Sequence, residues 1–298
     1  MRLPSFESWN NGERPRLRLL QRFVRRRDLG GLAPGLARSG SLEARLAVTE
    51  KDVRRAQKLR YRVFFEEGGA TPDATARLIR RDVCPFDAIC DHLIVVDHAL
   101  VGRRGASKVV GAYRLLSQDA AERNFGFYSA REFDVTTLTA AHPGKRFLEV
   151  GRACVASSHR GRHVLDLLWR GLWAYACHHR ADVLIGCASL MGTDPEAHAA
   201  AIRALSSGGD PALRAAPALG GHAPSRTVIE PAYGRALARA LPPLIKGYWR
   251  LGATFSPEGV VDPIFGTTDV FVALPLGGVE ARYLQHFRVE GSARPLAA

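Results

Sequence analysis

The chain has 298 residues and a formal net charge of +13, from 42 Lys and Arg against 29 Asp and Glu. A hydrophobic content of 46% is enough for a sizeable core and excludes an intrinsically disordered chain. No apolar run in the sequence is long enough for a transmembrane helix, and five Cys without a CxxC pair argue against a disulfide scaffold or a zinc ribbon. The charge indicates an anionic partner: nucleic acid, an acidic protein or a membrane surface.

The N-terminal segment carries much of this charge, since residues 1–30 contain eight Arg and three acidic residues. Four of these Arg share one side of a helical wheel: Arg14, Arg18, Arg22 and Arg25. The pattern is typical of a basic amphipathic helix on anionic lipid, and a solvated helix or a disordered arm fits it as well. A Gly/Pro/Ser-rich linker follows. We therefore expect an N-terminal segment over residues 1–41 and a folded domain over residues 42–298.

The first half of the domain begins with alternating apolar and polar residues over 42–49, which predict a strand. Thr49 with Asp52 predicts the N-cap and acidic first turn of a helix that ends before the Gly68-Gly69 pair. Apolar runs at 92–97 and 108–117 predict two antiparallel strands, and a third predicted strand spans 146–156.

The second half continues with a strong helix at 159–180, a buried strand at 181–190 and a helix at 193–207, with Asp194 or Thr193 as N-cap. A low-complexity loop at 206–226 is expected to be flexible. A helix or loop at 242–255 and a last strand at 267–276 complete the domain. This order of elements predicts the α+β class, with helices on both faces of a mixed, mostly antiparallel sheet.

Glu149 and Arg152 stand out chemically, because both lie in a predicted apolar strand. A buried acid is costly unless it is paired, so Glu149 is either a functional acid with a shifted pKa or half of a structural ion pair. In a regular strand the two side chains face opposite sides, unless a bulge intervenes. Arg114 is a similar charge in the middle of an apolar strand.

The turn formed by Arg160, Gly161 and Arg162 opens a helix directly after a strand. Free N–H groups, a positive dipole end and two Arg would suit the phosphate of a carrier arm, although an ordinary basic helix start has the same pattern. No group of residues has the spacing of a metal site, so we predict no metal. Cys154 close to Glu149 could act as a nucleophile or be a small core residue.

Seven longer motifs of the sequence resemble one family: RYRVFFEEGGA, CPFDAICDHLIVVD, LEVGRACV, LLWRGLWAYA, GCASLMGTDP, PPLIKGYWRLGA and DPIFGTTDVFVALP. Over residues 42–290 the chain resembles the ornithine-lipid N-acyltransferases, a hemolysin-like branch of the GNAT superfamily related to acyl-homoserine-lactone synthases. The resemblance implies a GNAT-like fold. It also implies transfer of a 3-hydroxyacyl chain from acyl carrier protein to the α-amine of ornithine, which gives lyso-ornithine lipid.

The resemblance also implies roles for individual residues. Glu149 and Arg152 would be catalytic, and the substrate-binding set would be Arg60, Phe64, Asp87, Asp91 and Arg114. Among these, Arg114 or Arg152 could bind the ornithine carboxylate, and Asp87 or Asp91 its side-chain ammonium. Cys84 and Pro85 stand where the lactone synthases have another acid, and Asp82 is the nearest replacement.

The turn at Arg160–Arg162 departs from the usual GNAT phosphate motif, which favours a carrier protein's phosphopantetheine over coenzyme A. We expect no permanently bound cofactor, and acyl carrier protein, ornithine and an anionic membrane surface as partners, without nucleic acid. The expected location is cytoplasmic, on the inner face of the cytoplasmic membrane. Three alternatives stay open: a lactone-type synthase, an N-acyltransferase for another amino acid, and a membrane- or lipid-binding protein without enzymatic activity.

Overall fold

The computed structural model describes residues 29–101, 107–218, 220–223 and 241–287. Its strands form one sheet in the order β1-β2-β3-β4-β5-β6-β8-β7, and among the described pairs only β5 and β6 run parallel. The strands are β1 (Gly35–Ser39), β2 (Leu42–Leu46), β3 (Asp91–Val101), β4 (Ser107–Ser117), β5 (Phe147–Val155), β6 (Val183–Met191), β7 (Thr254–Asp262) and β8 (Thr267–Pro275). The predicted α+β class with a mostly antiparallel sheet is confirmed.

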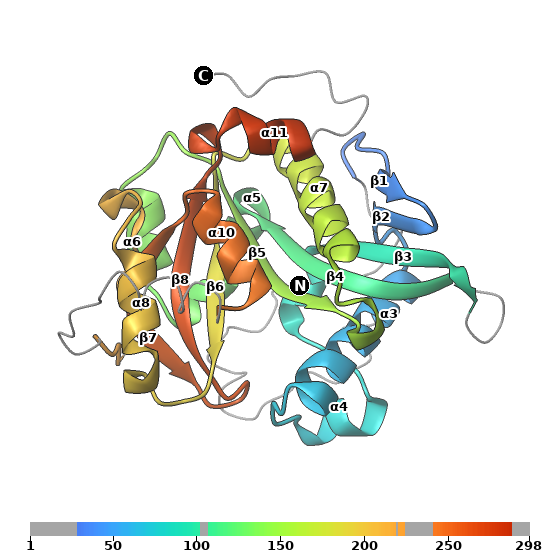
Figure 1. Ribbon diagram of the computed structural model, residues 1–298, viewed down its shortest axis with the longest axis horizontal. Helices are drawn as coiled ribbons and strands as arrows, with labels where there is room; N and C mark the ends of the chain where they lie inside the picture. Colours follow the sequence, from blue (N-terminus) through green and yellow to red (C-terminus); the bar gives the residue numbers. More distant parts are fainter. Residues whose placement is uncertain (1–28, 102–106, 219, 224–240, 288–298) are drawn as a thin grey trace.

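Helices cover both faces of this sheet (Figure 1). The α-helices are α3 (Glu50–Tyr61), α4 (Ala74–Ile79), α5 (Gln118–Glu122), α6 (Val135–Ala140), α7 (Arg162–His178), α8 (Ala199–Ser206), α10 (Pro243–Arg250) and α11 (Ala281–Phe287). Shorter helical turns are the π-helix η2 (Arg62–Glu67) and the 3-10 turns η3 (Pro85–Ala88), η4 (Tyr128–Arg131), η5 (Ser157–His159), η6 (Glu196–His198), η7 (Pro211–Leu213) and η8 (Leu276–Gly278). Within the described residues, none of the helices combines the length and the apolar character needed to cross a bilayer.

Several local signals act as the sequence predicts. The Thr49 side chain accepts a hydrogen bond from the Asp52 backbone N–H at 3.2 Å and caps α3. Strands β3 and β4 pair antiparallel. Helix α7 lies close against the sheet because Gly171 faces Leu93, where a Cβ atom would come within 2.7 Å of the leucine side chain. The predicted cap of α3 and the predicted apolar face of α7 are thus both present in the structure.

Other expectations are corrected by the structure. Strand β1 lies within the predicted linker and pairs with β2, so the sheet starts before residue 42. Strand β7 replaces the predicted end of a helix or loop, and α8 begins at Ala199, later than predicted, because the Asp194 carboxylate caps only the short turn η6. The described part of the 206–226 loop packs on the sheet, with Leu213 buried, and the flexibility expected of this loop stays a prediction. The predicted amphipathic helix falls on residues 1–28, outside the described residues.

Candidate active site

A fork between β5 and β6 creates the central cavity. The two strands pair at only three positions, from Phe147 opposite Val183 to Glu149 opposite Ile185, and then diverge. Gly186 follows at the fork, where a Cβ atom would lie 2.4 Å from the backbone oxygen of Val150, so only glycine fits this close approach. A cavity of about 310 Å³ fills the opening between the strands.

This cavity is lined from both faces of the sheet. Tyr113 and Arg114 are neighbours in β4 and point to opposite sides, yet both line it. Tyr113 meets the hydroxyl of Tyr248 from α10 on one face, whereas Arg114 and Glu149 lie on the other. The cavity at the fork is therefore bordered by residues from both faces of the sheet.

A β-bulge brings Glu149 and Arg152 to the same cavity. Arg114 pairs with Gly151 and Ala112 with Cys154, so two residues of β5 stand opposite Tyr113 alone. Arg152 is one of the two and has a φ of 54°, a left-handed conformation that is uncommon for a residue with a side chain. The β-bulge that brings Glu149 and Arg152 to the same side of β5 is therefore present, and both side chains line the cavity.

A buried ion-pair network supports the floor of the site. Arg60, only 1% exposed, donates two hydrogen bonds of 2.8 Å to the Asp87 carboxylate, and its Nε lies 2.8 Å from Asp82. Gln57 donates a further hydrogen bond to Asp87. Burial alone would raise the pKa of Asp87, but the Arg60 guanidinium outweighs it and holds that pKa well below its usual range. Asp87 stays ionised and is outside the lining of the cavity.

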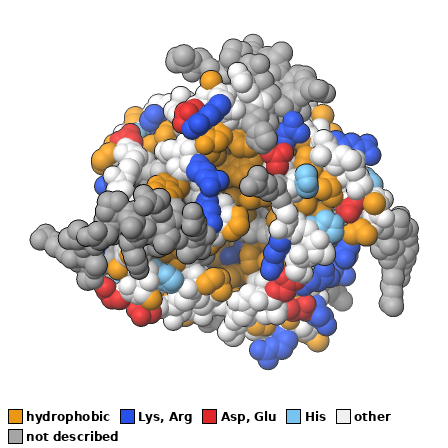
Figure 2. Space-filling view, in the orientation of Figure 1, with side chains coloured by type: hydrophobic (Ala, Val, Ile, Leu, Met, Phe, Trp, Pro, Cys, Tyr) orange, Lys and Arg blue, Asp and Glu red, His pale blue; other side chains and the backbone are white. Residues whose placement is uncertain are grey.

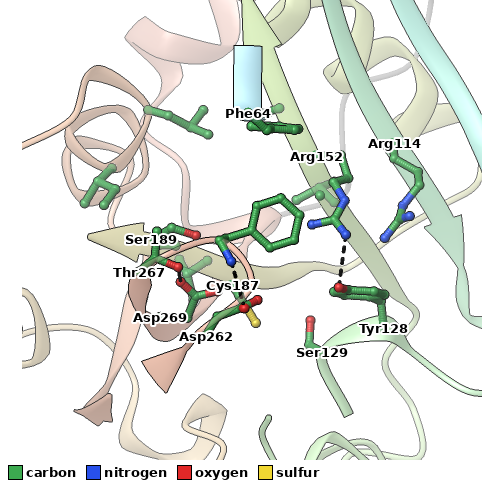
Figure 3. Close-up of a pocket in the computed structure, with 18 of the residues that line it drawn as sticks. Phe64, Arg114, Tyr128, Ser129, Arg152, Cys187, Ser189, Asp262, Thr267 and Asp269 are labelled. Carbon is green, nitrogen blue, oxygen red and sulfur yellow. Dashed lines mark hydrogen bonds between the residues drawn. The ribbon is translucent and has the colours of Figure 1, made fainter. Parts of the chain in front are cut away.

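Arg152 and Arg114 extend this network toward the cavity. Arg152 Nε lies 3.4 Å from Asp82, and its Nη2 donates to the Tyr128 hydroxyl at 3.1 Å. Its guanidinium stacks on Phe265 at 4.2 Å, and that of Arg114 stacks on Tyr128 at 4.8 Å. Asp82 thus supplies the second acid of the network, although it lies before the position where the lactone synthases were expected to have one. The stacking fixes both Arg side chains where they face the cavity (Figure 3).

Glu149 is fully engaged by the turn η4. Its carboxylate accepts hydrogen bonds from the backbone N–H groups of Tyr128 at 2.7 Å and Ser129 at 2.6 Å, and a short one from the Ser129 hydroxyl. Burial raises the pKa of Glu149, although the hydrogen bonds from Ser129 and Tyr128 lower it in part. This carboxylate can therefore take up a proton more readily than an exposed one, while it orients the turn beside it.

A second acidic group in the cavity was not predicted. Glu132 follows η4, Asp262 ends β7 and Asp269 lies in β8, and all three line the cavity with Cys187. Figure 3 shows Asp262 and Asp269 on the side of the cavity away from Arg114 and Arg152. Asp269 sits in an apolar strand as Glu149 does, so the signal that singled out Glu149 was present here as well.

The remaining predicted residues are divided between the cavity and its surroundings. Phe64 lines the cavity from the π-helix η2, a helix type that is frequent at functional sites. Asp91 accepts a hydrogen bond from the Tyr175 hydroxyl at 2.7 Å, outside the lining of the cavity. Cys154 is buried, and burial raises its pKa to about 12, which makes a thiolate nucleophile scarce.

The basic turn Arg160–Arg162 lies where α7 begins, beyond the end of β5 and outside the cavity lining. Gly161 is the N-cap residue of α7, without a side-chain cap, and Arg160 is paired with Glu67. The structure describes only the backbone of Arg162. The helix start therefore leaves N–H groups available, but Arg160 would have to leave Glu67 before it could bind a phosphate.

A second cavity, of about 450 Å³, adjoins the first and shares Tyr128, Arg152 and Phe265 with it. Most of its other lining is apolar, with Phe65, Val83, Phe86, Phe125 and Ile264 among it. The space-filling view shows a hollow in this face of the molecule, with a largely hydrophobic floor and Lys and Arg side chains at its rim (Figure 2). The two cavities, both with many apolar lining residues, thus meet at Arg152.

Known proteins resemble this chain in sequence over most of its length. Residues 59–170 match the family model described as an acetyltransferase (GNAT) domain. The L-ornithine N(alpha)-acyltransferase of Agrobacterium fabrum is 46% identical, over 84% of this chain and 86% of that protein. The protein of the same name from Rhizobium meliloti is 44% identical, over 89% of this chain and 90% of its own length. The solved N-acyl amino acid synthase FeeM from uncultured soil microbes is 12% identical, covers 79% of this chain and 91% of its own, and has a TM-score of 0.42.

Proposed function

Because the chain belongs to the family of L-ornithine N(alpha)-acyltransferases, we propose that it transfers a 3-hydroxyacyl chain from acyl carrier protein to the α-amine of ornithine. The observation that carries this proposal is the cavity at the β5–β6 fork, which joins Glu149 and Arg152 to an acidic group within one space. A dibasic amino acid, with an anionic carboxylate and a cationic side chain, matches that distribution of charge. The names of the homologues favour this acceptor over the lactone-forming alternative.

The chemistry follows from the groups that face the cavity. The neutral α-amine of ornithine attacks the thioester carbonyl carbon, the C–N bond forms, and the C–S bond breaks as the thiol of the carrier arm leaves with a proton. Glu149 takes the proton that the amine loses, directly or through a water, and passes it to the sulfur of the leaving group, so that one proton moves from nitrogen to sulfur. Arg152, whose side chain is 14% exposed, binds the ornithine carboxylate, since Arg114 is more deeply buried, at 4% exposed.

The acyl chain would occupy the second cavity, since its lining is mostly apolar and it meets the first at Arg152. A phosphopantetheine arm would enter through the fork, with its phosphate at Gly161 and Arg160 once Glu67 is displaced. The N-terminal segment of residues 1–41 would hold the protein at an anionic membrane surface on the cytoplasmic side, where a lipid product leaves.

The direct test is mass spectrometry of the products that the purified full-length protein forms from 3-hydroxyacyl carrier protein and a mixture of amino acids. The expected product is N-acylated ornithine, formed more slowly from the matching acyl-coenzyme A. A lactone, or an acylated amino acid other than ornithine, would contradict the proposal.

The role of Glu149 has its own test. Glu149→Gln should abolish turnover, because an amide cannot accept the proton of the amine, and circular dichroism should report an intact fold. Unchanged turnover in this variant would remove Glu149 from the mechanism.

A further inference from the structure

Three carboxylates gather at one end of the fork cavity without an ion-pair partner among the described residues. The ligand atoms of Glu132, Cys187 and Asp269 lie within 4.8 Å of one another, and Asp262 lines the same cavity. None of the ion pairs among the described residues includes Glu132, Asp262 or Asp269. The Oε2 atom of Glu132 is buried and accepts no hydrogen bond from the described residues. Asp269 is buried and Glu132 and Asp262 are half-buried, and acids shielded from water are costly without a cation, so this end of the cavity is suited to receive one.

The electrostatic surroundings of the cluster favour the binding of a cation. Burial, with the nearby Asp269 carboxylate, raises the pKa of Glu132 to about 8. Burial also raises the pKa of Asp269, even though the Thr267 hydroxyl donates a 2.8 Å hydrogen bond to it. A bound cation would reverse both effects, because it stabilises the ionised carboxylates.

An ammonium group fits this end better than a divalent metal ion. Asp269 Oδ1 is engaged by Thr267 and Asp262 Oδ1 by the backbone N–H groups of Ile264 and Phe265. The oxygens that remain suit the several N–H donors of an ammonium, which requires no fixed coordination geometry.

The opposite end of the cavity supplies the complementary charge. Arg152 and Arg114 line it there, whereas Asp262 and Asp269 lie across the cavity with Ser189 and Thr267 (Figure 3). A ligand that spans the two ends carries an anion at one end and a cation at the other, joined by a short aliphatic chain.

We propose that Glu132, Asp262 and Asp269 bind the side-chain ammonium of ornithine, and that this contact selects ornithine over amino acids with a neutral side chain. The inference rests on the proposed function and deepens it, since it assigns the acceptor's orientation: carboxylate at Arg152, side-chain ammonium at the acidic end, α-amine toward the fork and Glu149. The acids that the family resemblance suggests for this contact, Asp87 and Asp91, are bound to Arg60 and to Tyr175 instead.

The experiment compares ornithine with norvaline, which has the same carbon chain and lacks only the terminal amine. Wild-type protein, Asp269→Asn and Glu132→Gln are assayed for kcat/KM with both acceptors and one acyl carrier donor. The ratio of kcat/KM for ornithine to that for norvaline should be high in the wild type and fall on the order of a hundredfold in each variant, because a buried charge contact is lost. Glu258→Gln, on the same strand as Asp262 but outside the cavity lining, is the matched control and should keep the wild-type ratio.

A folding readout keeps the comparison independent of stability. Each cavity variant replaces an acid whose ionisation is costly in the empty protein with a neutral amide, so its Tm should equal or exceed that of the wild type. A parallel fall of both substrates in the variants, or equal kcat/KM for both in the wild type, would overturn the inference and leave the acyltransferase intact. Activity that is lost in EDTA and restored by Mg²⁺, Mn²⁺ or Zn²⁺ would assign the cluster to a metal and overturn it too. Failure to acylate any amino acid would overturn the proposed function, and the inference with it.

Discussion

At the scale of single residues, the most consequential feature is that some buried charged side chains pair with each other, whereas others face the cavity without an ion-pair partner among the described residues. Arg60 and Asp87 satisfy each other in the interior, whereas Glu132 and Asp269 face a cavity without an ion-pair partner among the described residues. A pair that is already satisfied contributes to stability, and a group that is not satisfied is available for a ligand. The two predictions that follow separate these two kinds of group.

Asp87→Asn should lower the free energy of unfolding by about 3–5 kcal/mol, because it removes one of the two carboxylates that pair with the buried Arg60 guanidinium. Urea denaturation monitored by circular dichroism gives the value. Glu66→Gln is the control: it breaks the surface pair with Arg80 and should change stability by less than about 0.5 kcal/mol. Equal losses in the two variants would contradict a stabilising role for the buried network.

Glu132→Gln should change how stability depends on pH. The folded-state pKa of Glu132 is about 8, above the ordinary 4.5, so between these values the folded protein keeps a proton that the unfolded chain has released. The free energy of unfolding should therefore fall as pH rises toward 8, by up to about 1.4 kcal/mol per pH unit more in the wild type than in the variant. The groups that face Glu132 are Asp269, Asp262, Cys187 and Arg131. Urea titrations of both proteins from pH 5 to pH 8 measure this difference, and parallel curves would contradict it.

At the scale of elements, the sequence predicts best those segments whose local signals and burial agree. Helix α3 has its Thr49 cap, α7 has one long apolar face, and both were predicted. The edge strands β1 and β7 were missed because β1 is short and Gly-flanked and β7 contains Pro257 and Gly259, which interrupt its alternation. The joint orientation of Glu149 and Arg152 depends on the bulge in β5, which hydrophobic periodicity alone does not reveal. The acidic end needs residues from three separate elements, a grouping that only the fold creates.

The fork itself is testable through Gly186. Gly186→Ala would place a Cβ atom 2.4 Å from the Val150 backbone oxygen, so β5 and β6 must move apart where they should meet. We expect a loss of about 1–3 kcal/mol in the free energy of unfolding, together with slower acyl transfer. Gly144→Ala, where nothing lies within 4 Å of the new Cβ, should leave both unchanged. Calorimetry and a turnover assay provide the two readouts, and equal behaviour of the variants would contradict a role for this close contact.

At the scale of the whole molecule, the net charge of +13 predicts a preference for an acidic partner. Attraction between exposed charges is screened by salt. The kcat/KM with acyl carrier protein as donor should therefore fall severalfold as ionic strength rises from about 0.01 to 0.15 M. The reference is the same assay with a small acyl thioester that lacks the carrier protein. Its kcat/KM should depend less on ionic strength. Equal salt dependence of kcat/KM with both donors would show that the net charge does not contribute to recognition of the carrier protein.

The short pairing between β5 and β6 has a further consequence for how such a protein can diversify. The sheet consists of two half-sheets joined at three residue pairs. Arg60 lies in α3, which packs on the β1–β5 half, and pairs with Asp87 of η3, whereas Asp262 and Asp269 lie in the β6–β8 half. Under the proposed assignment, substitutions at Asp262 and Asp269 would alter contacts to the acceptor's side chain without touching the Arg60–Asp87 pair, whereas Glu132 and Arg152 belong to the first half. Exchanging the β6–β8 half between relatives would therefore test how much of acceptor choice Asp262 and Asp269 determine on their own.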